Sequence, residues 1–370
     1  MGGLDIVFYT FVVVVIIQVI FYLFLFSRFA FLKPKKAIPK NIPVSVIICA
    51  KNEASNLKTF LPSVIAQNYP EFEIVLINDA SSDDTLDVIQ EFSKAYKNIK
   101  TVDVKSIEAF WGNKKYALTL GIKAASYDYF LFTDADCKPL SKHWIKEMSA
   151  HFDNKKSVVL GYGAYSKIKH SFLNKLIRFE TLVTAVNYFS FALAGSPYMG
   201  VGRNLAYTKK VFFKANGFIN HIKVRSGDDD LFVNQVSTKE NTAISISKNS
   251  FTISKPKTTF KTWFRQKRRH ISTARHYRTT HKILLTSLYV SNLFFWVLPI
   301  VLFIYVFNWQ IVLGLFLFRI ILQSIILGQS AKKLNETDLL VFLPFLEIFL
   351  ILLQLTIFIN NLISKPNHWK

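Results

Sequence analysis

Long apolar stretches constrain this 370-residue chain more than any other feature of its sequence. The first covers residues 6–26 and is long enough to cross a bilayer, which takes roughly 20 apolar residues. A second block, 283–328, is too long for one span and divides near its middle, which predicts spans at 284–306 and 310–329. A last span is expected at 339–363. The sequence therefore predicts a membrane protein with one N-terminal and about three C-terminal transmembrane helices.

Basic residues follow the first apolar run and set its expected orientation. They are Arg28, Lys33, Lys35, Lys36 and Lys40. A signal peptide is the competing interpretation, but no basic segment precedes the run and no small-residue cleavage site follows it. By the positive-inside rule, the chain before the run lies outside and the long loop after it is cytoplasmic. Lys332 and Lys333 mark a second cytoplasmic turn, so we expect a multi-pass protein of the cell (inner) membrane.

The net charge of +22 restricts the partners that the chain can take. A basic surface attracts nucleic acid, anionic lipid or phosphorylated substrates, or is simply a solvated surface with positive flanks around the spans. No nucleic-acid-binding module is recognisable, so we expect membrane lipid and no nucleic acid among the partners. The two cysteines, Cys49 and Cys137, form no CxxC pair, which argues against zinc and disulfide sites and predicts small buried side chains.

The loop between the first and second spans alternates short apolar strands with helical stretches. VSVIICA at 44–50, EIVLIND at 73–79 and YFLF at 129–132 indicate the strands. This alternation is typical of an α/β domain with a mostly parallel sheet, whose ligands bind beyond the carboxyl ends of the strands. The polar residues at these ends are Asn52, Glu53, Asp79, Asp134 and Asp136.

The predicted organisation has four parts. They are an N-terminal transmembrane helix at 1–27, a basic linker at 28–42, a cytoplasmic domain at 43–280 and a C-terminal membrane domain at 281–370. No GxGxxG follows the first strand, and neither GxxxxGK[ST] nor HExxH occurs. The sequence therefore gives no support to a dinucleotide-binding domain, a P-loop or a zinc protease.

Two acidic clusters and one basic segment carry the chemistry. Asp134 and Asp136 form a DxD after a strand, where a divalent cation could bridge carboxylate and phosphate oxygens. The acids at 228–230 lie side by side, so one of them is a candidate general base with a raised pKa; the alternative is the acidic first turn of a helix. QKRRH at 266–270 either clamps a diphosphate or contacts anionic lipid.

Several segments, in this order, resemble those of family 2 glycosyltransferases, especially the membrane-integrated synthases of hyaluronan, chitin and cellulose type. They are VSVIICAKNE (44–53), INDASSDDT (77–85), GNKKYALTLGI (112–122), FTDADCKP (132–139), MGVGRNLAY (199–207), GDDDLFVN (227–234) and QKRRH (266–270). The resemblance implies a GT-A-like fold that binds a nucleotide sugar. One departure is His270, where the synthases carry Trp.

The resemblance also implies roles for individual residues. Those implied to bind the donor nucleotide are Ala50, Asn52, Glu53, Asp79, Lys114 and Asp134. Asp136 is implied as the ligand of Mg²⁺ or Mn²⁺. The aligned base is Asp229, with its neighbour Asp228 as the other candidate. The residues implied at the leaving group and acceptor are Gln266, Arg269 and His270.

The function that this resemblance implies is that of an inverting, metal-dependent glycosyltransferase. It would move a sugar from a nucleotide-sugar donor, with UDP favoured, to a hydroxyl of a saccharide or lipid-linked acceptor. The β-linked product, made at the cytoplasmic membrane face, would serve cell-surface polysaccharide or glycolipid synthesis. The alternative is a catalytically silent nucleotide-binding partner of a polysaccharide export system, against which the intact Asp79, Asp134, Asp136 and Asp229 argue.

Overall fold

The structure, a computed structural model, describes residues 2–33, 38–105, 114–224 and 226–364. Three predicted features lie partly outside these residues: the basic linker at 34–37, the GNKKYALTLGI segment at 112–113 and the C-terminal tail at 365–370. The chain divides into two compact units. The first consists of Met1–Lys33, Ser171–Ala194 and Phe264–Pro366, and the second of Pro34–His170, Gly195–Trp263 and Asn367–Lys370.

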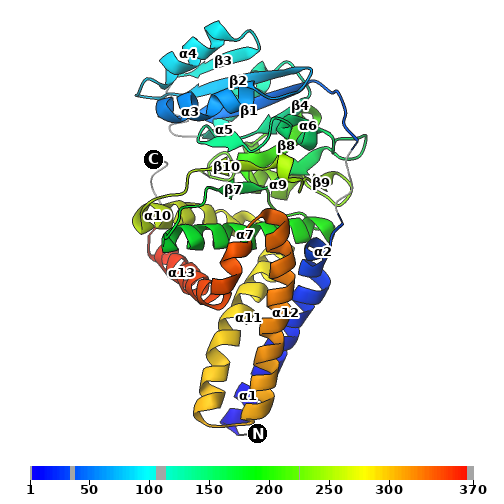
Figure 1. Ribbon diagram of the computed structural model, residues 1–370, viewed down its shortest axis with the longest axis vertical. Helices are drawn as coiled ribbons and strands as arrows, with labels where there is room; N and C mark the ends of the chain where they lie inside the picture. The colour runs from blue at the N-terminus through cyan, green and yellow to red at the C-terminus, as the bar shows by residue number, and fades with distance from the viewer. Residues whose placement is uncertain (1, 34–37, 106–113, 225, 365–370) are drawn as a thin grey trace. The chain divides into compact units, whose positions relative to one another are not determined.

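The first unit is helical. Its elements are α1 (Gly3–Ile20), the π-helical η1 (Phe21–Phe26), α2 (Ser27–Ala30), α7 (Phe172–Leu193), η6 (Ala274–His276), α11 (Thr279–Ile304), α12 (Trp309–Leu334), η7 (Thr337–Phe342) and α13 (Leu343–Ile363) (Figure 1). Helix α10 (Phe260–Ile271) begins in the second unit and belongs to the first from Phe264 onward. Within the described residues, four helical segments are long and apolar enough to cross a membrane: Gly3–Ala30, Thr279–Ile304, Trp309–Leu334 and Thr337–Ile363. The prediction of one N-terminal and three C-terminal apolar helices is confirmed.

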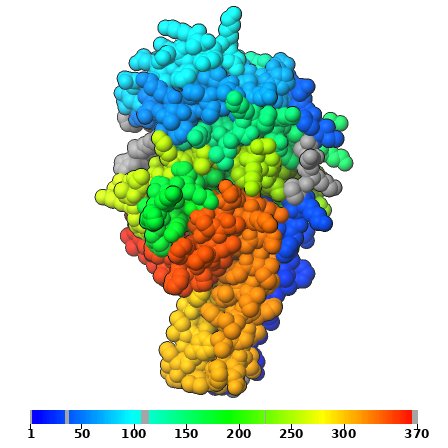
Figure 2. Space-filling view, in the orientation of Figure 1, coloured from blue at the N-terminus to red at the C-terminus, as the bar shows by residue number. Residues whose placement is uncertain are grey.

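Helices α1, α11 and α12 pack together through apolar side chains. Phe11, Phe295 and Val312 lie in this core and are fully buried. The outward faces of α11 and α12, the yellow and orange surface in Figure 2, expose large side chains such as Ile304 and Ile311. An apolar surface of this kind is typical of contact with lipid or another protein rather than water.

Helix α7 belongs to this helical unit, although the sequence predicted that its residues lie inside a continuous domain at 43–280. Its apolar side chains pack against other helices, as where Phe189 stacks on Phe29 with ring centroids 5.1 Å apart. Its Arg178 is buried and pairs with Glu336 and Asp338 at the start of η7. Burial of an arginine with two carboxylates ties α7 to this unit.

The second unit is built on a seven-stranded sheet. Its strand order is β3-β2-β1-β4-β8-β6-β9, with parallel pairing from β3 through β4. The strands are β1 (Val44–Ala50), β2 (Phe72–Asp79), β3 (Ile99–Val104), β4 (Tyr129–Phe132), β6 (Val158–Leu160), β8 (Leu205–Thr208) and β9 (Thr242–Ile244). Because β1 and β2 are covered on both faces, both are continuous apolar runs, as parallel strands usually are. The predicted mostly parallel α/β fold is confirmed.

Crossover connections between the parallel strands place the helices on the two faces of this sheet. Helices α3 (Ala54–Ile65) and α4 (Thr85–Ala95) share one face, and α5 (Lys114–Ala124) lies against the other (Figure 1). Gly121 lets α5 approach β2 closely, because a Cβ there would lie 2.1 Å from Ile77 Cδ1. In register, Ile47 of β1 pairs with Val75 of β2 and Phe132 of β4, so the three strands end at one edge.

A small second sheet and several short helices complete this unit. The sheet has the order β5-β10-β7. The remaining elements are β5 (Cys137–Pro139), α6 (Trp144–Ser149), β7 (Gly163–Tyr165), η3 (Gly202–Asn204), α8 (Lys209–Lys214), η4 (Ile219–His221), α9 (Asp230–Val236), η5 (Lys248–Ser250) and β10 (Thr252–Ser254). β5 directly follows the DxD and pairs with β10, whose Ser254 accepts a hydrogen bond from Arg203 (3.2 Å), so this sheet links the DxD to the segment that precedes β8.

Candidate functional site

The loops after β1 and β2 are bound to each other at the carboxyl edge of the sheet. After the buried Ala50, Asn52 donates its N–H to Ser81 Oγ (3.0 Å), and its Oδ1 accepts the N–H of Ser82 (2.8 Å). The N–H of Glu53 donates to Thr85 Oγ1 at 2.8 Å. Asn52 has a positive φ of 54°, which asparagine tolerates better than most residues. The loops predicted to bind the nucleotide thus form one pre-organised edge.

Asp79, the last residue of β2, keeps a buried oxygen without a hydrogen-bond donor. Its Oδ2 has no hydrogen-bond partner among the described residues, and the nearest cation, Lys51 Nζ, is 4.0 Å away. Burial raises the pKa of Asp79, and Lys51 and Lys114 counter this only in part. Buried acceptors in folded proteins are nearly always satisfied. A ligand with a hydroxyl or N–H group would satisfy this one.

Lys114 joins the two acidic clusters that the sequence separates widely. From the first turn of α5, its Nζ lies 2.9 Å from Asp134 Oδ1 and 2.9 Å from Asp228 Oδ2. Although burial opposes it, the two carboxylates hold the pKa of Lys114 well above its usual value. A permanently charged ammonium therefore fixes the spacing between the DxD and the downstream acids.

The acids at 228–230 lie where the chain turns into α9. Gly227 makes this turn with a φ of +93°, a conformation open mainly to glycine. Asp229 is the N-cap of α9: its Oδ1 accepts the N–H of Asp230 (2.8 Å), and its Oδ2 accepts the N–H of Gly202 (2.7 Å). The interpretation as an acidic helix start is thus met, and Lys114 also links the cluster to the DxD.

The neighbouring acids of this cluster have opposite electrostatic environments. Burial alone would raise the pKa of Asp228, but the Lys114 ammonium lowers it overall. Burial, followed by the charges of Asp228 and Asp230, raises the pKa of Asp229 to about 7. Of the two candidates, Asp229 therefore has the pKa of a group that exchanges protons near neutral pH.

Asp134 and Asp136 form the best candidate metal site of the described residues. Ligand atoms of Asp134, Asp136 and Cys137 all lie within 4.8 Å of one another. Burial, and then the charges of Asp134 and Glu53, raise the pKa of Asp136. This concentration of carboxylate oxygens fits a hard cation such as Mg²⁺ or Mn²⁺.

Both cysteines lie at the site rather than in a remote core. Cys49 lines the cleft beside Lys114 and is only partly buried. Cys137 is buried, with its Sγ 2.9 Å from Ser254 Oγ and 3.4 Å from Asp136 Oδ1. Because burial and Asp136 raise its pKa, Cys137 remains a thiol and is a poor ligand for a hard cation.

The sequence interpretation missed the importance of the segment 202–204. Gly202 donates its N–H to Asp229, as described above. Arg203 stacks on Tyr165, with its guanidinium 4.1 Å from the ring centroid, and donates to the carbonyl of Ala164 (3.1 Å). The positive charge of Arg203 lowers the pKa of Asp136 and so partly offsets the effect of burial. MGVGRNLAY was the available signal, but its sequence alone does not show that Gly202 binds one acidic cluster while the charge of Arg203 acts on the other.

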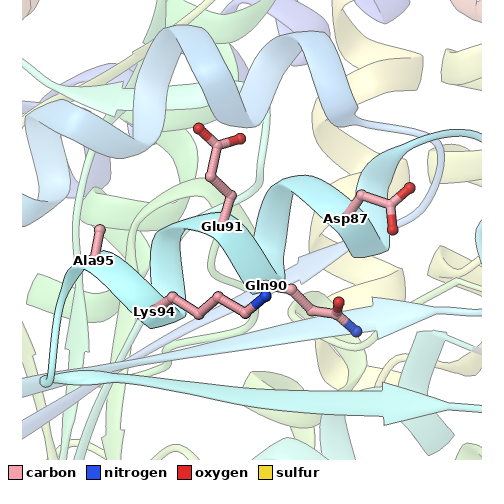
Figure 3. A pocket seen from close by; sticks show the side chains of 5 residues that line it. All are labelled: Asp87, Gln90, Glu91, Lys94 and Ala95. Atoms are coloured by element: carbon pink, nitrogen blue, oxygen red, sulfur yellow. The ribbon is translucent and has the colours of Figure 1, made fainter.

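A cleft at the strand ends gathers several of these groups. Its polar lining comes from Cys49, Lys114, Thr133, Asp134, Asp228 and Asp229, with the backbone of Gly202. A shallower depression along α4 is lined by Asp87, Gln90, Glu91, Lys94 and Ala95 (Figure 3). Its side chains lie on one helix and project into solvent, so we place the site at the strand ends.

The three predicted residues of QKRRH lie on α10, in the first unit. Arg269 Nη2 lies 3.4 Å from the ring nitrogen of the exposed His270. Gln266 is partly buried on the same helix. Within the second unit, the structure therefore brings together the strand-end residues, Lys114 and the acids at 228–230, whereas Gln266, Arg269 and His270 belong to the other unit.

Comparison with known proteins shows what the part of the chain before the acids at 228–230 is similar to. Residues 45–215 match the family model described as glycosyl transferase family 2. A poly-beta-1,6-N-acetyl-D-glucosamine synthase of Staphylococcus epidermidis is 41% identical over 93 residues, which are 25% of this chain and 21% of that protein. A probable glycosyltransferase of Bacillus subtilis, YdaM, is 28% identical over 248 residues, 63% of this chain and 55% of that protein. The chain thus spans between about a fifth and about half of these relatives' lengths.

A solved structure supports the fold. The mannosyltransferase PcManGT from Pyrobaculum calidifontis, in complex with GDP-Man and Mn²⁺, superposes with a TM-score of 0.60. The match covers 94% of this chain and 99% of that one, at 16% sequence identity. At this identity the likeness shows the fold alone, which is of the GT-A type.

Proposed function

Because residues 45–215 form a family 2 glycosyltransferase domain, we propose that the chain is an inverting enzyme that transfers sugar from a nucleotide sugar to an acceptor hydroxyl. The donor is a nucleoside diphosphate sugar, with UDP favoured, and the acceptor is a saccharide or a lipid-linked molecule. The observation that carries this proposal is Asp229, a carboxylate with a pKa of about 7 in one cleft with Lys114 and Asp134.

Asp229 is the general base of the proposed reaction. Its carboxylate takes the proton of the acceptor hydroxyl while that oxygen bonds to the anomeric carbon of the sugar. The bond from this carbon to the diphosphate oxygen breaks, and its electron pair leaves with the nucleoside diphosphate. Because attack and departure occur on opposite faces, an α-linked donor gives a β-linked product. The hydrogen bond from Gly202 holds the carboxylate in place.

The strand-end loops form the proposed donor site. Asp79 presents a buried acceptor that has no hydrogen-bond donor among the described residues, which suits a ribose hydroxyl or a base N–H. Asn52 and Glu53 are held by backbone hydrogen bonds beside it. Ala50, which the resemblance implies at the nucleotide, is the buried last residue of β1.

Asp134 and Asp136 would hold a divalent cation at the diphosphate. When bound, the cation would offset charge that develops on the departing diphosphate. Lys114 keeps Asp134 in place by its ion pair, and Arg203 adds a fixed positive charge nearby. From the resemblance we assign Gln266, Arg269 and His270 of α10 to the leaving group and acceptor.

The four apolar helices suit a multi-pass protein of the cell (inner) membrane. Positive flanks favour a cytoplasmic catalytic unit, where nucleotide sugars are made. One relative is named a polysaccharide synthase, so we propose that the product is a cell-surface polysaccharide or a glycolipid, made in contact with membrane lipid.

A donor screen on the purified, detergent-solubilised protein tests the proposal. UDP-sugars and GDP-sugars are supplied with Mn²⁺ and a membrane lipid extract, and mass spectrometry follows new glycosides. We expect one donor to give a product with a β-linkage. Nucleotide binding without transfer from any donor would instead indicate the silent export partner.

A further inference from the structure

Lys115, the neighbour of Lys114, is buried and is not one of the residues that line the cleft. Its side chain is 1% exposed. Its ammonium donates to three backbone carbonyls, those of His221 (2.7 Å), Val224 (2.9 Å) and Ser226 (2.8 Å). An ammonium group has three donors, so these bonds use all of them. Burying an ammonium is unfavourable unless such bonds compensate for its lost hydration.

The three carbonyls belong to the segment that leads directly into the acids at 228–230. Ser226 precedes Gly227, whose φ of +93° turns the chain. A Cβ at Gly227 would lie 2.5 Å from Leu231 Cδ1, so this turn requires glycine. After the turn, Asp228 meets Lys114 and Asp229 meets the N–H of Gly202. The anchored segment therefore determines where both carboxylates lie.

We propose that Lys115 is a positioning residue for catalysis, which clamps the three carbonyls and so holds Asp229 at the acceptor hydroxyl. This rests on the proposed role of Asp229 as base. The two adjacent lysines then have separate tasks: Lys114 ties the downstream acids to the DxD through side chains, and Lys115 fixes the backbone from which they extend. Lys115 can do this without touching a substrate.

Lys115→Met tests the clamp, because it keeps the length of the side chain but removes all three donors. Displacement of a catalytic group by about 1 Å can cost about 10²-fold in rate. We expect kcat to fall by about this factor, while the affinity for donor nucleotide, measured by calorimetry, stays near that of the unaltered protein. Lys123→Met, at the exposed other end of the same helix, is the matched control and should leave both values unchanged. If the methionine variant does not fold, the same measurements are made on Lys115→Gln, which removes the charge but keeps two N–H donors.

The decisive measurement repeats Lys115→Met in the Asp229→Asn background with a radiolabelled donor. If Lys115 acts through Asp229, the second substitution should add almost no further loss, because the base it positions is already gone. An equal fold-loss in both backgrounds, or a parallel loss of nucleotide binding, would overturn the clamp. Normal transfer by Asp229→Asn alone would instead overturn the proposed base, so the two failures are distinguishable.

Discussion

Each unit of this protein buries a cluster of charges, but the two clusters differ in how completely their polar groups are satisfied. In the first unit, Arg319 is fully buried and pairs with Glu347 through two bonds, Nη1 to Oε2 (3.0 Å) and Nη2 to Oε1 (2.7 Å). Gln18 and Asn292 accept further bonds from the same guanidinium at 3.0 and 2.9 Å. In the second unit, Asp79 keeps a buried oxygen without a hydrogen-bond donor among the described residues.

The difference distinguishes a structural cluster from a binding site. A satisfied buried network specifies how helices pack and has no unused group to offer a ligand. The cluster of the second unit, which lies at the strand ends, instead places Asp134 and Asp136 side by side and holds Asp229 between two other acids. Such like charges are costly until a cation, a substrate or a proton joins them. This comparison predicts that ligands and pH act on the second cluster, and that substitutions in the first change stability alone.

Removal of the cation should have the largest effect. We expect EDTA to abolish sugar transfer and Mn²⁺ or Mg²⁺ to restore it, because the carboxylates of Asp134 and Asp136 would repel the departing diphosphate unless a cation joins them. Asp136→Ala should abolish transfer while the circular dichroism spectrum stays unchanged. The control is Asp87→Ala, an exposed acid on α4, which should remain active. Full activity in EDTA would contradict metal dependence.

Substitution of the proposed base should have the next largest effect. Asp229→Asn keeps the size of the side chain but removes its basicity, and loss of a general base costs roughly 10²–10⁴-fold in rate. We expect this variant to bind donor nucleotide normally and to transfer almost no sugar. Asp228→Asn should be intermediate because it weakens the ion pair with Lys114, and Asp230→Asn should retain more activity. Transfer rates and nucleotide affinities of all three variants are the measurement.

Two outcomes of this series would revise the assignment. A fully active Asp229→Asn beside an inactive Asp228→Asn would move the base by one residue. Activity in all three variants would mean that this cluster takes no part in the reaction and serves only as the acidic start of α9.

The sequence predicted the architecture well because the decisive signals are local. Apolar runs predicted all four candidate spans, and strands ending in acids predicted the parallel sheet and its active edge. The bridge from Lys114 to Asp134 and Asp228 was not predictable, because it depends on how distant segments converge in space. Nor does anything local distinguish Arg203 among the 46 lysines and arginines.

Helix α7 shows the same limit at the level of domains. Its sequence mixes apolar residues with Lys175, Arg178 and Glu180, and it lies inside the range 43–280 that was predicted as one cytoplasmic domain. Only the packing shows that Arg178 is neutralised by Glu336 and Asp338 and that Lys267 pairs with Glu180. The proposed roles of the individual site residues likewise stay predictions until variants are measured.

Breaking the satisfied cluster should lower stability and leave catalysis intact. Arg319→Leu leaves Glu347 buried without its partner, which typically costs about 3–5 kcal/mol. We expect a lower melting temperature in detergent but an unchanged kcat per folded molecule. The double variant Arg319→Leu with Glu347→Leu should recover much of the loss, since no charge remains unpaired. A specific loss of kcat at full stability would show that this cluster takes part in function.

The smallest expected effect is a shift in pH dependence that separates Asp229 from its neighbours. Because its pKa is raised to about 7, Asp229 is protonated below that pH and cannot accept the hydroxyl proton. The rate constant kcat/KM should therefore be constant above pH 7 and fall about tenfold per pH unit below it.

Asp230→Asn removes one of the charges that raise the pKa of Asp229, while its amide oxygen can still accept the N–H of Leu231. The acidic limb of this variant should move to lower pH, with the plateau little changed, in steady-state assays from pH 5 to 8. Lys114 and Asp228 also face Asp229, and because they are unaltered in Asp230→Asn, they cannot cause the shift. An acidic limb at the same pH in both proteins would mean that a group other than Asp229 controls the rate.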